Sequence, residues 1–233
     1  MAIKNIHEIF DAFDDDAERL DSWEDGIMFD PVKTENFAAK SIKRHEFIDE
    51  IKLPDCDVAL NRQSTRGFSQ EKITFEDLSK FLSVLKCVDS KFSYPSAGRL
   101  YPIDVILYAK EGRVENLEEG FYAYSSNHYI QKIGDGHVSK TAHFFNNREI
   151  FHSSAFSIFF FYDYNWSMPK YGGMGYFYGI LDAGIILEAL TNSAEENGLG
   201  SCIIGDMKFS SIKDIADWNN EKVYLCAMEV GYK

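Results

Sequence analysis

The fold of this chain is decided around residues 94–108, which read YPSAGRLYPIDVILY. Residues 103–108 predict a strand, because β-branched and aromatic side chains suit a pleated sheet. The preceding Pro95, Ser96, Ala97 and Gly98 are small or rigid, so they allow backbone amides to approach a flat ligand closely. The same segment is equally typical of an ordinary loop before a strand, and its role depends on what surrounds it.

On both sides of this segment, the sequence predicts a mixture of helices and strands. The expected elements are a helix over residues 75–85 with Thr74 as N-cap, a hairpin of residues 120–124 and 128–130, a strand over 155–162 that is buried on both faces, a long helix over 176–197 stopped by Gly198, and a last strand over 223–230. The helices and strands do not alternate strictly, and no Gly-x-Gly-x-x-Gly motif follows a strand. We therefore expect an α+β fold rather than a Rossmann fold.

The composition limits the class of protein. The 233 residues are enough to bury a core as one large domain or two small ones. A net charge of −13 argues against nucleic-acid binding, since the phosphate backbone attracts basic surfaces. An aromatic content of 15% suits either the stacking of a planar ligand or an aromatic core.

The first fifty residues differ in character from the rest. Residues 8–30 carry ten acidic side chains against Arg19 alone. Apolar residues at three-four spacing between Ile6 and Leu20 predict an amphipathic helix. We therefore expect residues 1–50 to form an acidic, helical extension. It either docks on its own domain, the interpretation that we favour, or serves as an adaptor for a partner protein.

The sequence predicts a cytoplasmic protein with no metal centre and no membrane association. The N-terminus lacks the basic start and apolar run of a signal peptide. The most apolar stretch, residues 155–162, is far shorter than the roughly 20 residues that cross a bilayer. The four cysteines have no Cys-x-x-Cys spacing, which indicates reduced thiols. The six histidines show no metal-binding spacing either.

Three further segments contain candidate functional groups. Arg62-Gln63-Ser64-Thr65-Arg66 places two guanidinium groups around hydroxyls, an arrangement that binds phosphate through charge-assisted hydrogen bonds. Lys170 precedes Tyr171, and an ammonium beside a phenol favours the phenolate, a base able to remove a carbon-bound proton. Residues 197–206, NGLGSCIIGD, follow the predicted helix stop and can present backbone N–H groups to an anionic ring. Each segment alone also fits an ordinary surface or a helix cap.

The order of these motifs is more informative than any one of them. The chain contains Arg-x-Ser-x-Arg, Pro-Ser-Ala-Gly-x-Leu-Tyr-Pro, Gly-Phe-Tyr-x-Tyr with His128, Lys-Tyr and Gly-Leu-Gly, in that order. This series resembles the SagB-type azoline dehydrogenases and the related oxidase of microcin B17 synthetase, which belong to the nitroreductase superfamily of FMN enzymes. The likeness covers roughly residue 53 to the C-terminus. Family members often carry arginines after Lys-Tyr, where this chain has Met174, Tyr176 and Tyr178.

The resemblance implies an α+β fold with a mixed, mostly antiparallel sheet flanked by helices. It also implies a homodimer with two FMN sites at its interface, formed by a domain over residues 51–233, with residues 1–50 as the extension. The implied site residues are Arg62, Ser64 and Arg66 for the phosphate and ribityl chain, Pro95, Ser96, Ala97 and Gly98 of the other subunit for the isoalloxazine ring, the backbone of Ile203, Ile204 and Gly205 for the ring edge, and Lys170 and Tyr171 as the catalytic pair.

The activity that we expect from this resemblance is the oxidation of a peptide thiazoline or oxazoline to the aromatic thiazole or oxazole. Tyr171, beside Lys170, would remove the acidic C4 proton while hydride leaves C5 for FMN, and O2 would reoxidise the flavin. The substrate would be a peptide tethered to a carrier protein of a nonribosomal synthetase, which we favour because the chain lacks an obvious peptide-clasp domain. The other context is a ribosomal peptide in a modification complex.

Two other functions stay open from the sequence. One is an NAD(P)H-dependent nitroreductase or flavin reductase on the same fold, against which the pair of Lys170 and Tyr171 argues. The other is a flavin-free scaffold that binds a partner through its acidic N-terminal helix. The sequence does not distinguish a thiazoline from an oxazoline substrate.

Overall fold

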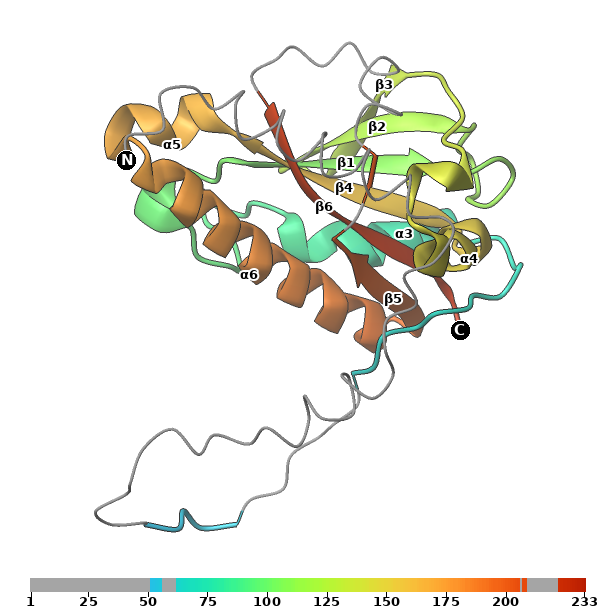
Figure 1. The fold of residues 1–233 in the computed structure, drawn as a ribbon, viewed down its shortest axis with the longest axis horizontal. Coiled ribbons are helices and arrows are strands. Elements are labelled where there is room, and N and C mark those ends of the chain that lie inside the picture. Colours follow the sequence, from blue (N-terminus) through green and yellow to red (C-terminus); the bar gives the residue numbers. More distant parts are fainter. Residues whose placement is uncertain (1–50, 56–61, 206, 209–221) are drawn as a thin grey trace.

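The computed structural model describes residues 51–55, 62–205, 207–208 and 222–233 (Figure 1). The helix predicted between Ile6 and Leu20 lies outside the described residues. The described elements are, in chain order, α3 (Phe75–Leu82), η1 (Ser83–Leu85), η2 (Ala97–Arg99), β1 (Ile103–Ala109), β2 (Gly120–Ser125), β3 (Tyr129–Gly134), η3 (Lys140–Ala142), α4 (Phe145–Ser153), β4 (Phe156–Asp163), α5 (Tyr164–Tyr171), α6 (Met174–Glu196), β5 (Leu199–Ile204) and β6 (Lys222–Tyr232), the η elements being short 3-10 turns.

A six-stranded sheet in the order β3-β2-β1-β4-β6-β5 forms the centre of the structure. The pairings between these strands are all antiparallel, which confirms the predicted α+β class. β4 lies between β1 and β6, and its residues 156–162 are buried, as the sequence predicts. Successive side chains of β4 point to opposite faces, so Phe159 and Phe160 belong to two different core clusters.

Helices cover both faces of this sheet. α3 and α6 pack on the face that contains Phe160, whereas α4 places Phe151 against Tyr108 on the other face (Figure 1). α3 begins where predicted, because Thr74 Oγ1 accepts a hydrogen bond from the Asp77 N–H at 3.0 Å. It ends at Leu82 and continues to the predicted end as the turn η1.

The long helix α6 begins two residues before its predicted start. It ends before Gly198, whose φ of +71° is the left-handed stop that the sequence indicates. Of the described helices, α6 is the one that is long and apolar enough, by length and composition, to cross a membrane. In this structure Ile186 and Leu190 of α6 belong to the core against the sheet.

The sequence patterns do not indicate α4, α5 or β5. β5 contains Gly200 and Ser201, which have little preference for strands, yet it pairs with β6 along its whole length. α5 contains Pro169, a residue that disfavours helix interiors, and it begins at the N-cap Asp163, whose carboxylate accepts from the Asn165 N–H. Tertiary contacts therefore override local preference at these elements.

β6 carries a buried ion pair on the face covered by α4. Glu229 Oε2 accepts hydrogen bonds from the hydroxyls of Ser154 and Ser157 at 2.5 and 2.8 Å, and lies 3.3 Å from Lys110 Nζ. Burial lowers the pKa of Lys110 to about 8, and Glu229 opposes this shift. In the unfolded chain the pKa of Lys110 has its reference value of 10.5. Between about pH 8 and pH 10.5, the unfolded chain therefore binds more protons at Lys110 than the folded chain does. The contribution of Lys110 to stability therefore rises as the pH increases from about 8 to 10.5.

Lys110→Met is expected to lower the free energy of unfolding by about 3–5 kcal/mol at pH 7, because Glu229 would stay buried without its cation. Adding Glu229→Gln should restore part of this loss. Urea titration followed by fluorescence measures both variants. The control is Lys132→Met, which removes ion pairs to the exposed Glu118 and Asp135 and should change stability little. Equal losses in the two lysine variants would contradict the role of burial.

Candidate active site

Lys170 and Tyr171, at the end of α5, lie against the loop that contains Gly98. A Cβ atom placed on Gly98 would overlap the Tyr171 hydroxyl oxygen and would lie 2.7 Å from Lys170 Nζ. Both functional atoms therefore converge on the small space that the glycine leaves open. Gly98 has a φ of +62°, a left-handed conformation that favours glycine. The structure thus brings together two segments of the predicted site that are distant in the sequence.

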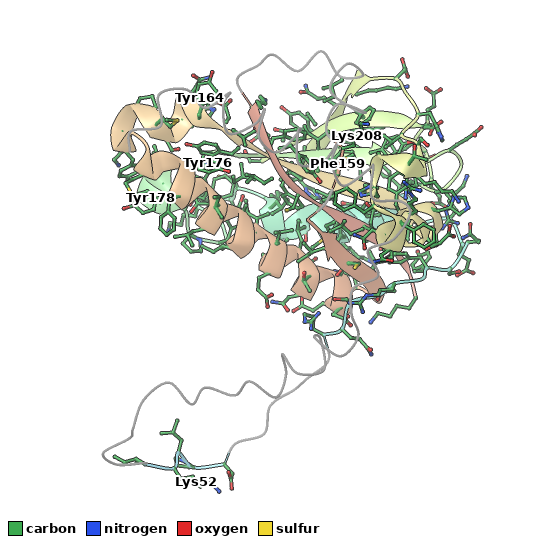
Figure 2. All side chains as sticks on the ribbon, viewed as in Figure 1. Lys52, Phe159, Tyr164, Tyr176, Tyr178 and Lys208 are labelled. Carbon is green, nitrogen blue, oxygen red and sulfur yellow. The ribbon has the colours of Figure 1, made fainter. Side chains whose placement is uncertain are left out.

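The phenol of Tyr171 is half-buried and has two close neighbours. The Tyr178 ring meets it edge-on, with the ring centroids 5.1 Å apart. Lys170 Nζ lies 5.1 Å from the centre of the Tyr171 ring, within the range of a cation–π contact. Figure 2 shows Tyr178 and Tyr176 on the part of α6 nearest to α5. A second tyrosine therefore contacts the phenol of Tyr171 from α6.

The loop of residues 95–98 is bound to α6 through Asp182. The Asp182 carboxylate accepts hydrogen bonds from the Ser96 hydroxyl at 2.6 Å and from the Ala97 N–H at 3.2 Å. Asp182 is buried. No motif in the sequence singles out this residue. The one available signal is an acidic side chain within an otherwise apolar part of the long helix.

Residues 62–66 lie beside β5, near the far end of α6. The Thr65 N–H donates to the Ser201 carbonyl at 2.9 Å, and the Thr65 side chain fills the space that a Cβ on Gly200 would need. Arg62 and Arg66 are exposed, and neither guanidinium has a hydrogen-bond or ion-pair partner within the described part of the chain. With the half-buried Ser64 between them, they form a donor set suited to a phosphate.

The remaining predicted residues follow along β5 toward Gly205. Ile203 is exposed, while Ile204 is buried in a small cluster with Phe68 and Cys202. Gly205 comes directly after the strand and is exposed. The backbone of this segment therefore continues the surface that begins with Arg62 and Arg66.

One chain does not bring the two groups of predicted residues together. The loop of Gly98 is fixed near Asp182, whereas residues 62–66 run beside β5, which follows the C-terminal end of α6 (Figure 1). The helix between Asp182 and Glu196 alone spans about 20 Å at the usual rise per residue. Lys170 and Tyr171 therefore lie in one half of the predicted site, and the arginines lie in the other.

His128, which the motif series also contains, lies away from Lys170. His128 hydrogen bonds through its two ring nitrogens to Ser79 Oγ at 3.0 Å and to the Tyr124 hydroxyl at 3.1 Å, which ties the β2–β3 hairpin to α3. It lines a pocket of about 70 Å³ between these elements, small beside the usual volume of ligand sites. Among the described residues, no group of three or more His, Cys, Asp or Glu side chains is placed to hold a metal ion.

Comparison with known proteins agrees with this architecture. The sequence profile of the nitroreductase family matches residues 59–232. A protein of Methanocaldococcus jannaschii described as a nitroreductase is 27% identical over 191 residues, covering 80% of this chain and 93% of that protein. A chain of the Escherichia coli microcin synthetase McbBCD complex, solved with truncated pro-MccB17 bound, superimposes with a TM-score of 0.80 at 16% identity, covering 98% of this chain and 94% of that chain.

A nitroreductase of Ralstonia eutropha superimposes with a TM-score of 0.62 at 16% identity, covering 78% of this chain and 87% of that chain. These likenesses confirm the fold that the motif order predicts. Proteins of this family generally use a flavin and are oxidoreductases. The match over most of the chain and the observed fold lead to one conclusion: the chain belongs to the nitroreductase family.

Proposed function

We propose that this protein is an FMN-dependent azoline oxidase, which converts a peptide thiazoline or oxazoline to the aromatic azole. The observation that carries the proposal is the convergence of Lys170 Nζ and the Tyr171 hydroxyl on Gly98. A reductase that only passes hydride between a nicotinamide and a flavin needs no such base. The oxidation of an azoline does need one, because a carbon-bound proton must leave the ring.

The residues present fit the phosphate and ring of FMN. Arg62 and Arg66 offer unpaired guanidinium groups, and Ser64 adds a hydroxyl, which together can neutralise and hold a phosphate. The lack of a side chain on Gly98 lets this loop, which would line the ring, approach the Lys-Tyr pair closely. When bound, FMN supplies the acceptor for the hydride that leaves the substrate ring.

Tyr171 acts as the base in this proposal. The C4–H of a peptide azoline lies next to both a C=N bond and a carbonyl, so it is acidic for a carbon-bound proton. The Tyr171 oxygen takes that proton, and Lys170 Nζ places a positive charge next to the Tyr171 ring. Tyr178 holds the ring of Tyr171 edge-on, which keeps the hydroxyl aimed at the space beside Gly98. O2 serves as the final electron acceptor.

The proposed substrate is a peptide. The likeness to the McbBCD complex, solved with truncated pro-MccB17 bound, supports a peptide presented within a synthetase complex as the first substrate to test. A peptide on a carrier protein of a nonribosomal synthetase is the second. An absorption spectrum of the purified protein, followed by mass spectrometry of a model thiazoline peptide under air, tests the function. Loss of two hydrogens from the peptide supports it.

Two other outcomes would favour a different function. Bleaching of the bound flavin by NADPH without air, with no azole formed from the peptide, would favour a nitroreductase or flavin reductase. The relative from Methanocaldococcus jannaschii is described as a nitroreductase, which makes this the second candidate. A colourless protein that FMN does not reconstitute would favour a partner-binding scaffold.

We also propose that the active form is a homodimer with two composite sites. The arginine segment and the catalytic pair lie at opposite ends of α6 in one chain, so a second copy is needed to bring them together. α6 supports this with an exposed apolar face at helical spacing, formed by Met174, Phe177, Ile180 and Leu181. A two-fold axis across this face would place residues 62–66 of one chain next to Lys170 and Tyr171 of the other.

Complementation between two inactive variants tests the composite site. One variant carries Arg62→Ala and Arg66→Ala, and the other carries Tyr171→Phe. When the two variants are co-expressed in equal amounts, half of the dimers contain one copy of each variant. Each mixed dimer has one intact site out of two, so about a quarter of the wild-type activity is expected. Azole formation by the co-expressed protein, purified without selection for mixed dimers, measures it.

The matched control co-expresses Tyr171→Phe with Lys170→Ala. Both changes fall in the same half of the site, so mixing should restore no activity beyond that of the two variants measured separately. If the first mixture stays as inactive as this control, the site does not combine Arg62 and Arg66 of one chain with Tyr171 of the other.

A further inference from the structure

Asp182 is a buried carboxylate that the proposed chemistry does not use. Only 4% of its surface is exposed. Its two oxygens accept from the Ser96 hydroxyl at 2.6 Å and from the Ala97 N–H at 3.2 Å. A carboxylate accepts stronger hydrogen bonds than a neutral group, and its burial is costly without them. This interaction therefore fixes the loop to α6 more firmly than a neutral contact would.

The loop that Asp182 binds has an unfavourable backbone conformation. Gly98, Arg99 and Tyr101 have φ values of +62°, +59° and +49°. Two of these are residues with a Cβ, for which the left-handed region costs free energy. Such a conformation persists only when the surrounding contacts impose it. The Ser96 hydroxyl provides one such contact, since it accepts from the Tyr101 N–H at 2.9 Å while donating to Asp182.

α6 contacts both sides of this arrangement. Lys170 and Tyr171 are joined to α6 by Gly172 and Gly173 alone, and Tyr178 of α6 contacts the Tyr171 ring. Asp182 lies one turn further along α6 and binds the opposing loop. α6 therefore contacts both sides of the site, the Tyr171 ring through Tyr178 and the loop of Gly98 through Asp182.

We infer that Asp182 is a positioning residue for the active site, which holds residues 96–101 in the strained conformation that sets Gly98 against Lys170 and Tyr171. This inference rests on the proposed function, because the activity that it affects is the oxidation of the azoline. Asp182 touches neither the pair nor the reacting ring. It acts through Ser96 and Ala97.

Asp182→Asn tests the inference with little change in size. The amide nitrogen cannot accept a hydrogen bond, so the interaction with either Ser96 or Ala97 must be lost or rebuilt. We expect kcat for azole formation to fall about 10- to 100-fold, because misplacement of a catalytic group by about 1 Å has effects of this size. KM for the peptide should change less than twofold, since the substrate contacts are not altered. The matched control is Glu188→Gln, an exposed acid-to-amide change on the same helix that should keep the wild-type kcat.

A double-mutant cycle separates positioning from general stability. Ser96→Ala should lower kcat by a similar factor, and the double variant of Ser96 and Asp182 should be no slower than the slower single variant. Ser96→Thr, which keeps the hydroxyl, should recover most of the activity. If Asp182→Asn does not fold, the Ser96 variants alone give the same comparison.

The outcomes distinguish this inference from the proposed function. A wild-type protein that forms no azole contradicts the function itself. A wild-type protein that forms azole, with Asp182→Asn and Ser96→Ala at the wild-type kcat, overturns the role of Asp182 alone. Strictly additive losses in the cycle, or a loss confined to KM, would also overturn it.

Discussion

Tyr171→Phe is expected to slow azole formation by about 10²–10⁴-fold, the usual contribution of a positioned general base. The substitution removes one oxygen atom and keeps the ring that packs against Tyr178. Fold and flavin content should therefore be unchanged. Lys170→Ala should cause a smaller loss, because the ammonium supplies a positive charge beside the Tyr171 ring without taking the proton itself. Single-turnover bleaching of the flavin by a thiazoline peptide, followed by mass spectrometry of the product, measures both variants.

Tyr164→Phe is the matched control for the loss of the hydroxyl. Tyr164 begins the helix α5 that Tyr171 ends, and it lies near the same end of the molecule (Figure 2). This variant should keep the wild-type rate. If Tyr171→Phe and Lys170→Ala both form azole at the wild-type rate with FMN bound, the two residues are not the catalytic pair.

Gly98→Ala is expected to lower kcat by about 100-fold or more, although it adds only a methyl group. The new Cβ would overlap the Tyr171 hydroxyl oxygen and crowd Lys170 Nζ, so the pair or the loop must move. A displacement of about 1 Å at a reacting group is enough for a loss of this size. The rate of azole formation and the melting temperature are measured on the same preparation.

Gly112→Ala separates the steric effect from the backbone effect. Gly112 has a φ of +66°, close to the +62° of Gly98, but no atom lies within 4 Å of the position that its Cβ would take. Both variants should lose similar stability, since both force alanine into the left-handed region. Only Gly98→Ala should lose activity. A Gly98→Ala enzyme as active as Gly112→Ala would show that the space beside Gly98 is not used in catalysis.

Elements with a strong local signal could be predicted from the sequence. The hairpin, β1, β4, α3 and α6 follow from side-chain periodicity, from the cap at Thr74 and from the stop at Gly198, all of which act within a few residues. α5 and β5 could not be predicted in the same way. Pro169 and Gly200 weaken their local preferences, and each element exists because it packs on α6 or pairs with β6.

The sequence by itself determined the α+β class, the order of the motifs and the chemical types of the candidate site residues. Only the tertiary structure decided which of them meet. Gly98 lies against Lys170 and Tyr171, and Asp182 holds the loop that contains Gly98. Arg62 lies apart from them in the same chain. The physical reason is that local patterns fix backbone preferences over a few residues. The contacts between distant segments depend on strand register and on how α6 packs, and no short stretch of sequence encodes these.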